Sequence, residues 1–289
     1  MIPQAFEYLR PKSLPEALAF LKQYGDRAKL LSGGQSLIPM MKLRLARPQY
    51  LIDLNRIAGL SYIKEDGGFL KIGALTREAE LESSALVRSK YPLLTDTTAV
   101  IADPQVRNLA TVGGNLAHGD PANDHPATMI ALGAQIAATS SKGERVIPVE
   151  SFFVSLFTTA LDEGEILTEI RIPVPPSKSG GAYLKVERKV GDFATAAVAV
   201  QLTLDDKGAI QKAGIGLTNV GPTPVKAKKA EDVLSGKKPD AGTIAQAAEL
   251  AAAEAEPSTD LRGPAEYKKG LVKELTKRAI SRALERASK

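Results

Sequence analysis

The sequence of 289 residues contains no cysteine, no tryptophan and only two histidines. Without cysteine, this chain alone cannot form disulfide bonds, thiolate zinc sites or cysteine-ligated iron–sulfur clusters. The absence also fits a reducing compartment. Two histidines are too few for a histidine-rich metal centre, so we expect no metal site in this chain.

The chain also lacks any apolar run long enough to span a bilayer. Its first residues, MIPQAFEYLRPKS, lack the charged-then-apolar pattern of a signal peptide. We therefore expect a cytoplasmic protein that is not transmembrane, either free or associated with the inner face of the membrane.

The composition, with 44% hydrophobic and 25% charged residues, is typical of a soluble globular protein, and the length is enough for two domains. The net charge of +5 is concentrated in residues 263–289. We interpret this segment as the solvated face of a helix, and a docking surface for an acidic partner is the second interpretation. Nucleic acid is not an expected partner.

The first half of the chain mixes helices and strands. Ser13 and Glu16 predict a capping box that begins a helix, and Gly25 predicts its end. A short strand at 29–31 then runs into a glycine turn and an apolar-periodic helix from residue 37, which is an order that builds anion-binding sites. Further on, the patterns predict strands at 69–73 and 165–173, and helices that start at 76 and cover 96–101.

Residues 173–181 are rich in proline, glycine and serine, and we place a domain boundary there. Beyond it, strands predicted at 183–189, 198–204 and 210–220 form an antiparallel meander, and helices dominate from residue 224. The sequence therefore predicts an α+β protein. Its first domain is residues 1–175, with α/β subdomains of about 1–57 and 58–175. Its second domain, residues 178–289, is a small antiparallel sheet with a three-helix cap.

Two similar glycine pairs stand out, Gly33-Gly34 and Gly113-Gly114, each between small polar residues. Glycine allows positive φ and lets a ligand approach main-chain N–H groups closely, and successive N–H groups in such a turn form an anion-binding concavity. Two such concavities suit a diphosphate. Two ordinary tight turns are the alternative, and the pattern alone favours that alternative.

The common nucleotide fingerprints are absent. Gly214-Ile215-Gly216 has Asn219 where a dinucleotide signature needs its third glycine, and the motif lies inside a predicted strand. Gly236-Lys237 lacks the other residues of a P-loop. A dinucleotide would have to bind this chain in another way.

The segments AKLLSGGQSLIPMMKLRLARPQYLIDL (28–54) and IADPQVRNLATVGGNLAHGDPANDHPA (101–127) resemble the paired FAD signatures of the flavoprotein subunits of molybdenum hydroxylases. That family includes aerobic carbon monoxide dehydrogenase and xanthine dehydrogenase. The resemblance continues through residues 165–176, 185–200, 214–224 and 260–271, and so covers nearly the whole chain. It implies the FAD-binding fold of the p-cresol methylhydroxylase and vanillyl-alcohol oxidase type.

The resemblance also implies which residues bind FAD. The pyrophosphate would lie between two loops that supply backbone N–H groups and hydroxyls. Other positions would fix the nucleotide, line the adenine and flavin ends, or pack beside the flavin ring. The residues of the two loops are Ser32, Gly33, Gly34, Gln35 and Ser36, and Thr111, Gly113, Gly114 and Asn115; the other positions are Asp124, Leu167, Lys185, Ile101 and Phe193.

Two of these positions depart from the family pattern, since Gln35 stands where some members have histidine and Phe193 where some have tyrosine. Each single residue also has a plainer interpretation. Asp124 could cap a helix, Lys185 could lie on a strand surface, and the apolar residues could belong to the core. The resemblance therefore rests on the whole set.

The family's chemistry implies an oxidoreductase subunit without catalytic side chains of its own. Electrons would arrive at FAD from the [2Fe–2S] clusters of a small partner subunit, while a large partner subunit holds the molybdenum–pterin centre. The assembly would be a dimer of heterotrimers, with quinone, oxygen or NAD as the external acceptor. The alternatives are a stand-alone flavin oxidoreductase, the flavin subunit of a related aldehyde, purine or N-heterocycle dehydrogenase, and a binding protein that uses its basic C-terminal helix.

Overall fold

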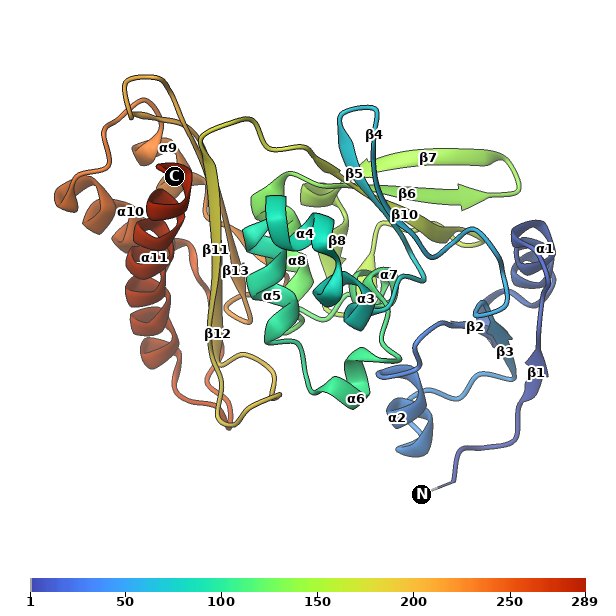
Figure 1. The fold of residues 1–289 in the computed structure, drawn as a ribbon. Coiled ribbons are helices and arrows are strands. Elements are labelled where there is room, and N and C mark those ends of the chain that lie inside the picture. The colour runs from blue at the N-terminus through green and yellow to red at the C-terminus, as the bar shows by residue number, and fades with distance from the viewer. Residues whose placement is uncertain (1) are drawn as a thin grey trace.

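The N-terminal part of the protein is built on a parallel sheet of order β1-β3-β2. The structure, a computed structural model, describes residues 2–289 (Figure 1). The elements of this part are β1 (Glu7–Leu9), α1 (Leu14–Tyr24), a 3-10 turn (Gly25–Arg27), β2 (Ala28–Leu31), α2 (Leu37–Lys42) and β3 (Tyr50–Asp53).

Helix α1 begins and ends where the sequence predicts. The Ser13 hydroxyl accepts a hydrogen bond from the Glu16 amide at 3.3 Å, which satisfies one of the free N–H groups of the first turn. The Glu16 carboxylate accepts from the Lys12 amide at 2.7 Å. Gly25 ends the helix with φ +52°. The buried face of α1 packs on β3, so this sheet has a small core of its own.

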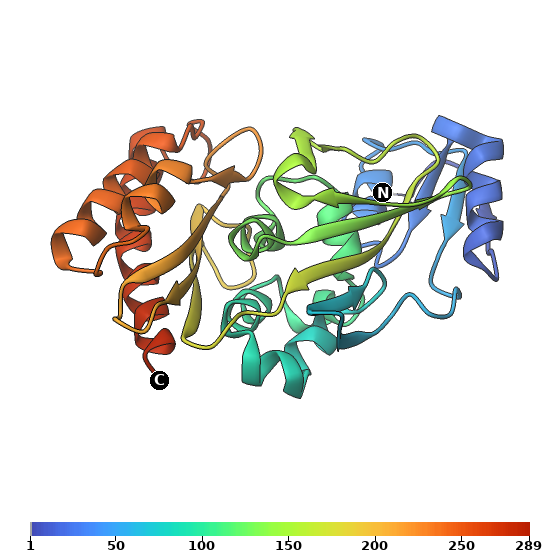
Figure 2. The ribbon, with the colours of Figure 1, turned by 90° about the horizontal axis from the view of Figure 1, so that it is seen from above.

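The middle part contains a five-stranded antiparallel sheet of order β4-β5-β10-β6-β7, with its helices gathered on one side (Figures 1 and 2). A two-stranded hairpin, β8–β9, lies beside it. The elements are β4 (Ile63–Asp66), β5 (Phe69–Gly73), α3 (Glu78–Ser83), α4 (Ala85–Lys90), α5 (Pro92–Ala99), α6 (Pro104–Arg107), α7 (Val112–Ala117), α8 (Asp124–Leu132), β6 (Gln135–Ser140), β7 (Gly143–Pro148), a 3-10 turn (Val149–Ser151), β8 (Phe153–Ser155), β9 (Thr158–Thr159) and β10 (Ile166–Pro173).

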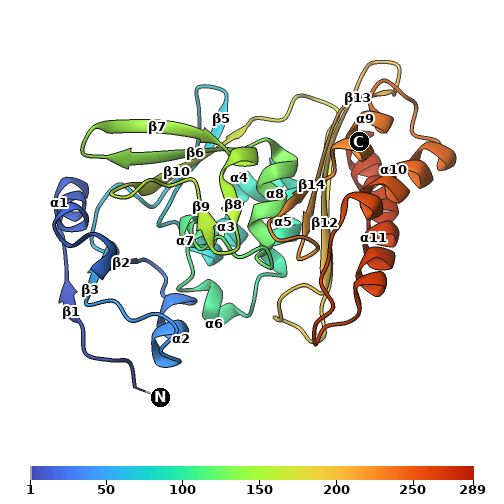
Figure 3. The ribbon, with the colours of Figure 1, turned by 180° about the vertical axis from the view of Figure 1, so that it is seen from behind.

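The C-terminal part is a four-stranded antiparallel sheet followed by three helices, as the sequence predicts (Figure 3). Helix α11 covers one face of this sheet, and α5 and α8 of the middle part cover the other. The elements are β11 (Ser179–Val186), β12 (Ala196–Leu204), β13 (Ile210–Thr218), β14 (Val225–Lys226), α9 (Lys228–Leu234), α10 (Ala241–Glu254) and α11 (Ala265–Ala287). Within residues 2–289, no helix combines the length and the apolar character that crossing a membrane requires.

Gly214 and Gly216, the motif that does not match a dinucleotide signature, let α8 lie directly on β13. A Cβ atom added at Gly214 would lie 2.0 Å from the Ala131 carbonyl oxygen, and one at Gly216 would lie 2.0 Å from the Ala127 carbonyl oxygen. Real Cβ atoms do not approach oxygen so closely, so only glycine allows this packing. The motif therefore joins the middle and C-terminal parts of the protein.

An ion pair strengthens the same junction. Asp96, on α5, accepts hydrogen bonds from both terminal nitrogens of Arg286 on α11, at 2.6 and 3.0 Å, and from the Tyr183 amide on β11 at 3.3 Å. Only 12% of the Asp96 side chain is exposed. A bidentate pair of this kind fixes orientation as well as distance, so it holds α11 in register with α5.

Several predicted boundaries were wrong, and two of them have a clear physical reason. Helix α5 covers residues 92–99 and ends two residues before the predicted end at 101. The chain then turns at Ala102, which has φ +46°. Strand β11 begins at Ser179, inside the segment 173–181 where we placed the domain boundary and before the predicted start at 183. Gly180 lies in this strand, and the position needs glycine because a Cβ there would lie 2.1 Å from the Ala283 carbonyl oxygen of α11. Glycine serves close packing at this position rather than chain flexibility.

We expect Gly216→Val to destabilise the protein by about 3 kcal/mol, because the side chain must push α8 away from β13. The measurement is the Tm of the purified chain. Gly270→Ala in α11 is the matched control: no atom lies within 4 Å of its added Cβ, so alanine should raise the stability by up to about 1 kcal/mol through helix propensity. An unchanged Tm for Gly216→Val would contradict the packing described here.

Candidate functional site

The two glycine segments, far apart in the sequence, meet in the structure. We call residues 32–36 and 109–115 the loop pair. The Thr111 hydroxyl donates a hydrogen bond to the Ser32 hydroxyl at 3.0 Å. A Cβ at Gly33 would lie 2.4 Å from the Leu109 carbonyl oxygen, and one at Gly114 would lie 2.7 Å from both hydroxyls. Glycine at these positions is therefore what lets the two loops touch.

The first loop presents free main-chain donors. Gly34 has φ +73°, a left-handed conformation that glycine adopts without strain. Within the described part of the chain, the amides of residues 33–36 donate no hydrogen bond to the protein. The Gln35 side chain donates to the Gly33 carbonyl at 3.3 Å, and Ser36 precedes α2 without capping it. Four successive unused N–H groups are the arrangement that binds anions.

The second loop differs from the prediction of a second amide concavity. Gly113 and Gly114 lie in the first turn of α7, and neither has positive φ. The Gly113 amide donates to the Ala74 carbonyl at 3.0 Å, and the Gly114 amide donates to the Thr111 hydroxyl at 3.1 Å. These N–H groups already have partners, so this prediction was wrong for the backbone. The pair is glycine because α7 packs against Ala74 on one side and Ser32 on the other.

Asn115 connects the loop pair to the start of α8. Its carbonyl oxygen accepts a hydrogen bond from the Asn123 side chain at 2.8 Å. Its side-chain oxygen, Oδ1, is buried and has no partner among the described residues. A buried acceptor without a donor is costly, so this atom suits a hydroxyl or N–H group of a bound ligand.

Asp124 and Lys185 form a buried ion pair. The Lys185 Nζ donates to the Asp124 carboxylate at 3.0 Å, and the Tyr183 hydroxyl donates to its other oxygen at 2.6 Å. Burial raises the pKa of Asp124, and Lys185 and Tyr183 oppose that shift because they stabilise the carboxylate. Neither residue is a free surface group: 3% of the Lys185 side chain is exposed. The structure therefore brings these two predicted site residues together.

Ile101 lies next to this pair, because Lys185 also donates to the carbonyl oxygen of the preceding residue, Val100, at 2.9 Å. The Ile101 side chain is buried. Leu167 is placed differently: it lies on β10, paired with Ala138 of β6, in the main core of the middle part. Its strand reaches the loop pair indirectly, because α7 packs on β10.

Phe193 lies on the loop between β11 and β12, and 45% of its surface is exposed. The Arg262 guanidinium lies 5.8 Å from the centre of its ring. The neighbouring Asp192 accepts hydrogen bonds from Arg188 at 2.8 Å and Arg262 at 3.0 Å, and these contacts lower the pKa of Asp192 to about 2. At Gly191 the loop approaches Ala102, next to Ile101, so Phe193 belongs to the same region as the Asp124 pair.

The sequence interpretation missed two polar residues at the loop pair. Asn55 donates to the Ser32 carbonyl oxygen at 2.8 Å, and Arg77 donates to the Asn55 side-chain oxygen at 2.6 Å and to the Leu109 carbonyl oxygen. One signal was available for Asn55. It follows β3, as Ser32 follows β2, and neighbouring parallel strands end at the same edge of a sheet.

These features fit the diphosphate of a dinucleotide. The first loop supplies four free amides, and the Ser32 hydroxyl accepts from Thr111 and so keeps its own hydrogen for a ligand. The glycine backbone leaves room for phosphate oxygens close to the amides. The buried oxygen of Asn115 adds an acceptor. No cysteine or metal ligand is needed for this kind of binding.

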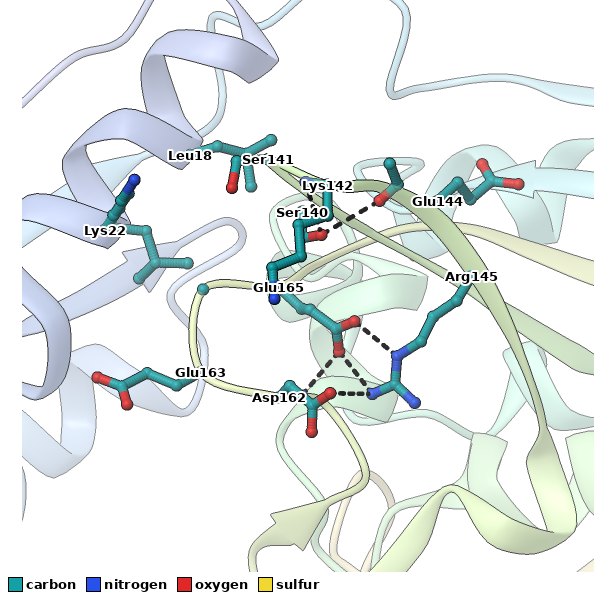
Figure 4. A pocket seen from close by; sticks show the side chains of 13 residues that line it. Leu18, Lys22, Ser140, Ser141, Lys142, Glu144, Arg145, Asp162, Glu163 and Glu165 are labelled. Carbon is teal, nitrogen blue, oxygen red and sulfur yellow. Dashed lines mark hydrogen bonds and ion pairs between the residues drawn. The ribbon is translucent and has the colours of Figure 1, made fainter.

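A hollow of about 550 Å³ lies elsewhere, between α1, the β6–β7 turn and residues 162–165 (Figure 4). Three of its charged groups pair with one another: Arg145 donates to the Glu165 carboxylate at 2.6 and 2.7 Å and lies 3.2 Å from Asp162. Arg145 holds the pKa of Glu165 below its ordinary value. The hollow contains none of the predicted FAD-binding residues.

Comparison with known proteins identifies both halves of the chain. Residues 4–175 match the family model described as the FAD binding domain in molybdopterin dehydrogenase. Residues 181–283 match the model described as the CO dehydrogenase flavoprotein C-terminal domain. The expected FAD-binding fold with a separate C-terminal sheet and helices is confirmed.

Similar proteins match over the whole chain. The carbon monoxide dehydrogenase medium chain of Afipia carboxidovorans is 46% identical and covers 99% of both chains. A structure of carbon monoxide dehydrogenase from Hydrogenophaga pseudoflava has a TM-score of 0.96 at 47% identity, covering 99% of both chains. Quinoline 2-oxidoreductase from Pseudomonas putida 86 has a TM-score of 0.92 at 34% identity, with the same coverage.

The similarity thus extends across both domain models and both the sequence and the structure comparisons. The chain belongs to the family of FAD-binding flavoprotein subunits of molybdenum hydroxylases, and within that family it is of the carbon monoxide dehydrogenase type.

Proposed function

We propose that the loop pair binds the diphosphate of FAD and that the chain passes electrons from a partner's [2Fe–2S] clusters to an external acceptor. The observation that supports the binding site is the run of four unpaired amides in the first loop, next to a second loop that touches it. When bound, FAD supplies the conversion between one-electron and two-electron transfer. The protein supplies position and electrostatics.

Each part of the site has a separate task in this proposal. The amides of residues 33–36 and the Ser32 hydroxyl donate to phosphate oxygens, while Thr111 holds Ser32 in place. Asn115 accepts a hydrogen bond from the ligand through its buried oxygen. The first loop therefore binds the anion, and the second loop shapes the site.

The residues around Lys185 flank the same ligand. Asp124 has one oxygen bonded to Tyr183 and the other to Lys185, and each carboxylate oxygen can accept a second hydrogen bond. A ligand hydroxyl can therefore join the ion pair without breaking it. Ile101 and Phe193 supply apolar surface for the ring systems in this proposal. Leu167 lies in the core of the middle part, and its contact with the ligand stays a prediction of the resemblance.

The partners follow from the chemistry that this chain lacks. Because it has no cysteine, clusters ligated by cysteine belong to another chain. We propose a small [2Fe–2S] subunit and a large molybdopterin subunit, assembled as a dimer of heterotrimers in the cytoplasm, either free or associated with the inner face of the membrane. Quinone, oxygen or NAD is the proposed acceptor. Carbon monoxide is the proposed substrate of the large subunit, by analogy with the similar carbon monoxide dehydrogenase medium chains.

We expect Gly34→Ala to weaken FAD binding by about tenfold, because alanine is strained at φ +73° and would shift the free amides. Gly114→Val should weaken it at least as much, since its side chain would separate Ser32 from Thr111. The measurement is the Kd of the deflavinated chain for FAD, from the quenching of flavin fluorescence.

Gly133→Ala is the matched control for these variants. Gly133 has φ +64°, so alanine is strained there to a similar degree, but no atom lies within 4 Å and the residue is outside the loop pair. Its Kd should stay within twofold of the unchanged chain. Equal FAD affinity in all four proteins would contradict the proposed site.

A second test concerns the partners. Co-expressed with candidate small and large subunits, the chain should co-elute with both, and the complex should reduce a dye with carbon monoxide as electron donor. The FAD-loaded chain alone should not do so, because it holds no substrate-oxidising centre in this proposal. Dye reduction with an aldehyde or an N-heterocycle, but not with carbon monoxide, would reject the proposed substrate and keep the subunit role.

A further inference from the structure

We propose that Arg77 and Asn55 are positioning residues that set the spacing of the loop pair, so that the affinity for FAD depends on them. The inference rests on the proposed FAD site and adds to it two residues that need not touch the ligand. The geometry points to a bridge, because each side chain contacts one loop and the two contact each other.

Arg77 is attached to the second loop by its backbone. It lies just before α3, and its main chain pairs with that of Thr111 in an isolated antiparallel bridge. Its amide donates to the Glu80 carboxylate at 3.0 Å, which fixes the start of the helix. The side chain donates through Nη1 to the Leu109 carbonyl oxygen, the atom that a Cβ added at Gly33 would meet first. Arg77 therefore holds the segment that the first loop packs against.

Asn55 is attached to the first loop. Its side-chain nitrogen donates to the Ser32 carbonyl oxygen at 2.8 Å and to the Asp53 carboxylate at 2.5 Å. Its side-chain oxygen accepts from Arg77 Nη2 at 2.6 Å. The path from Ser32 through Asn55 and Arg77 to Leu109 thus closes a ring around the contact between the two loops. Replacing either side chain removes hydrogen bonds of this path, so the two loops lose their side-chain connection through it.

The bridge needs the shape of arginine. Arg77 reaches two acceptors on different segments through two nitrogens of one planar group, and a lysine ammonium at the end of a flexible chain does not keep two such acceptors at a fixed separation. Neither residue belongs to the core: Asn55 is exposed and Arg77 is partly exposed. Their loss should therefore affect the ligand site more than the stability of the fold.

The test compares FAD affinity with stability in purified, deflavinated chains. We expect Arg77→Met, Arg77→Lys and Asn55→Ala each to raise the Kd for FAD by about tenfold, the effect of losing one or two hydrogen bonds. Because both side chains act in one network, the Arg77→Met/Asn55→Ala double variant should bind FAD about as well as Arg77→Met alone. The Tm of each ligand-free variant should stay near that of the unchanged chain.

Arg145→Met is the matched control. Arg145 also bridges a main-chain carbonyl, that of Ala160 at 2.7 Å, and a side chain, that of Glu165, but it lies outside the loop pair. Its Kd for FAD should not change. If Arg77→Met fails to fold, the exposed Asn55→Ala variant decides the question.

Three results would overturn the inference while leaving the FAD site intact: unchanged affinity in Asn55→Ala, full recovery of affinity in Arg77→Lys, or independent effects that multiply in the double variant. Recovery by lysine would mean that only the positive charge matters. Failure of the unchanged chain to bind FAD at all would instead reject the proposed function.

Discussion

The site depends on one contact, the approach of the backbone at Leu109 to the backbone at Gly33. A single methyl group at Gly33 would lie 2.4 Å from the Leu109 oxygen, so any other residue would separate the two loops. The hydroxyl pair of Ser32 and Thr111 and the bridge of Asn55 and Arg77 also join the two loops. The position of the free amides in the first loop therefore depends on glycine at residue 33.

Local patterns predicted much of the fold. The strand, turn and helix at residues 28–42 and the cap of α1 by Ser13 could be predicted because their signals lie within a few residues of each other. The conformation of Gly113-Gly114 could not be predicted from the neighbouring sequence, because it depends on a contact with Ala74, which is distant in the chain. For the same reason Gly180 was left out of the predicted strand: its role depends on a carbonyl oxygen of α11, about a hundred residues later.

Among the site residues too, local patterns could be predicted and contacts between distant segments could not. The resemblance named the two loops and the residues around Lys185, but the pattern could not show that Lys185, Asp124 and Tyr183 form one buried unit. Nor could it find Asn55 and Arg77, whose roles need the parallel pairing of β2 with β3 and the bridge from 77 to 111. Such residues carry no signal in their own neighbourhood, because the atoms they join are far apart in the sequence.

The closeness of α8 to β13 has a consequence for how glycine motifs are interpreted. Gly214 and Gly216 have the two-residue spacing that usually draws attention to a nucleotide, yet they face the carbonyl oxygens of a helix. On a strand, alternate residues point to the same side, so this spacing also marks a strip of bare backbone on one face of a sheet. A search guided by glycine spacing alone would assign the cofactor to the C-terminal part of this protein. There the strip instead allows the sheet to pack closely against the middle part.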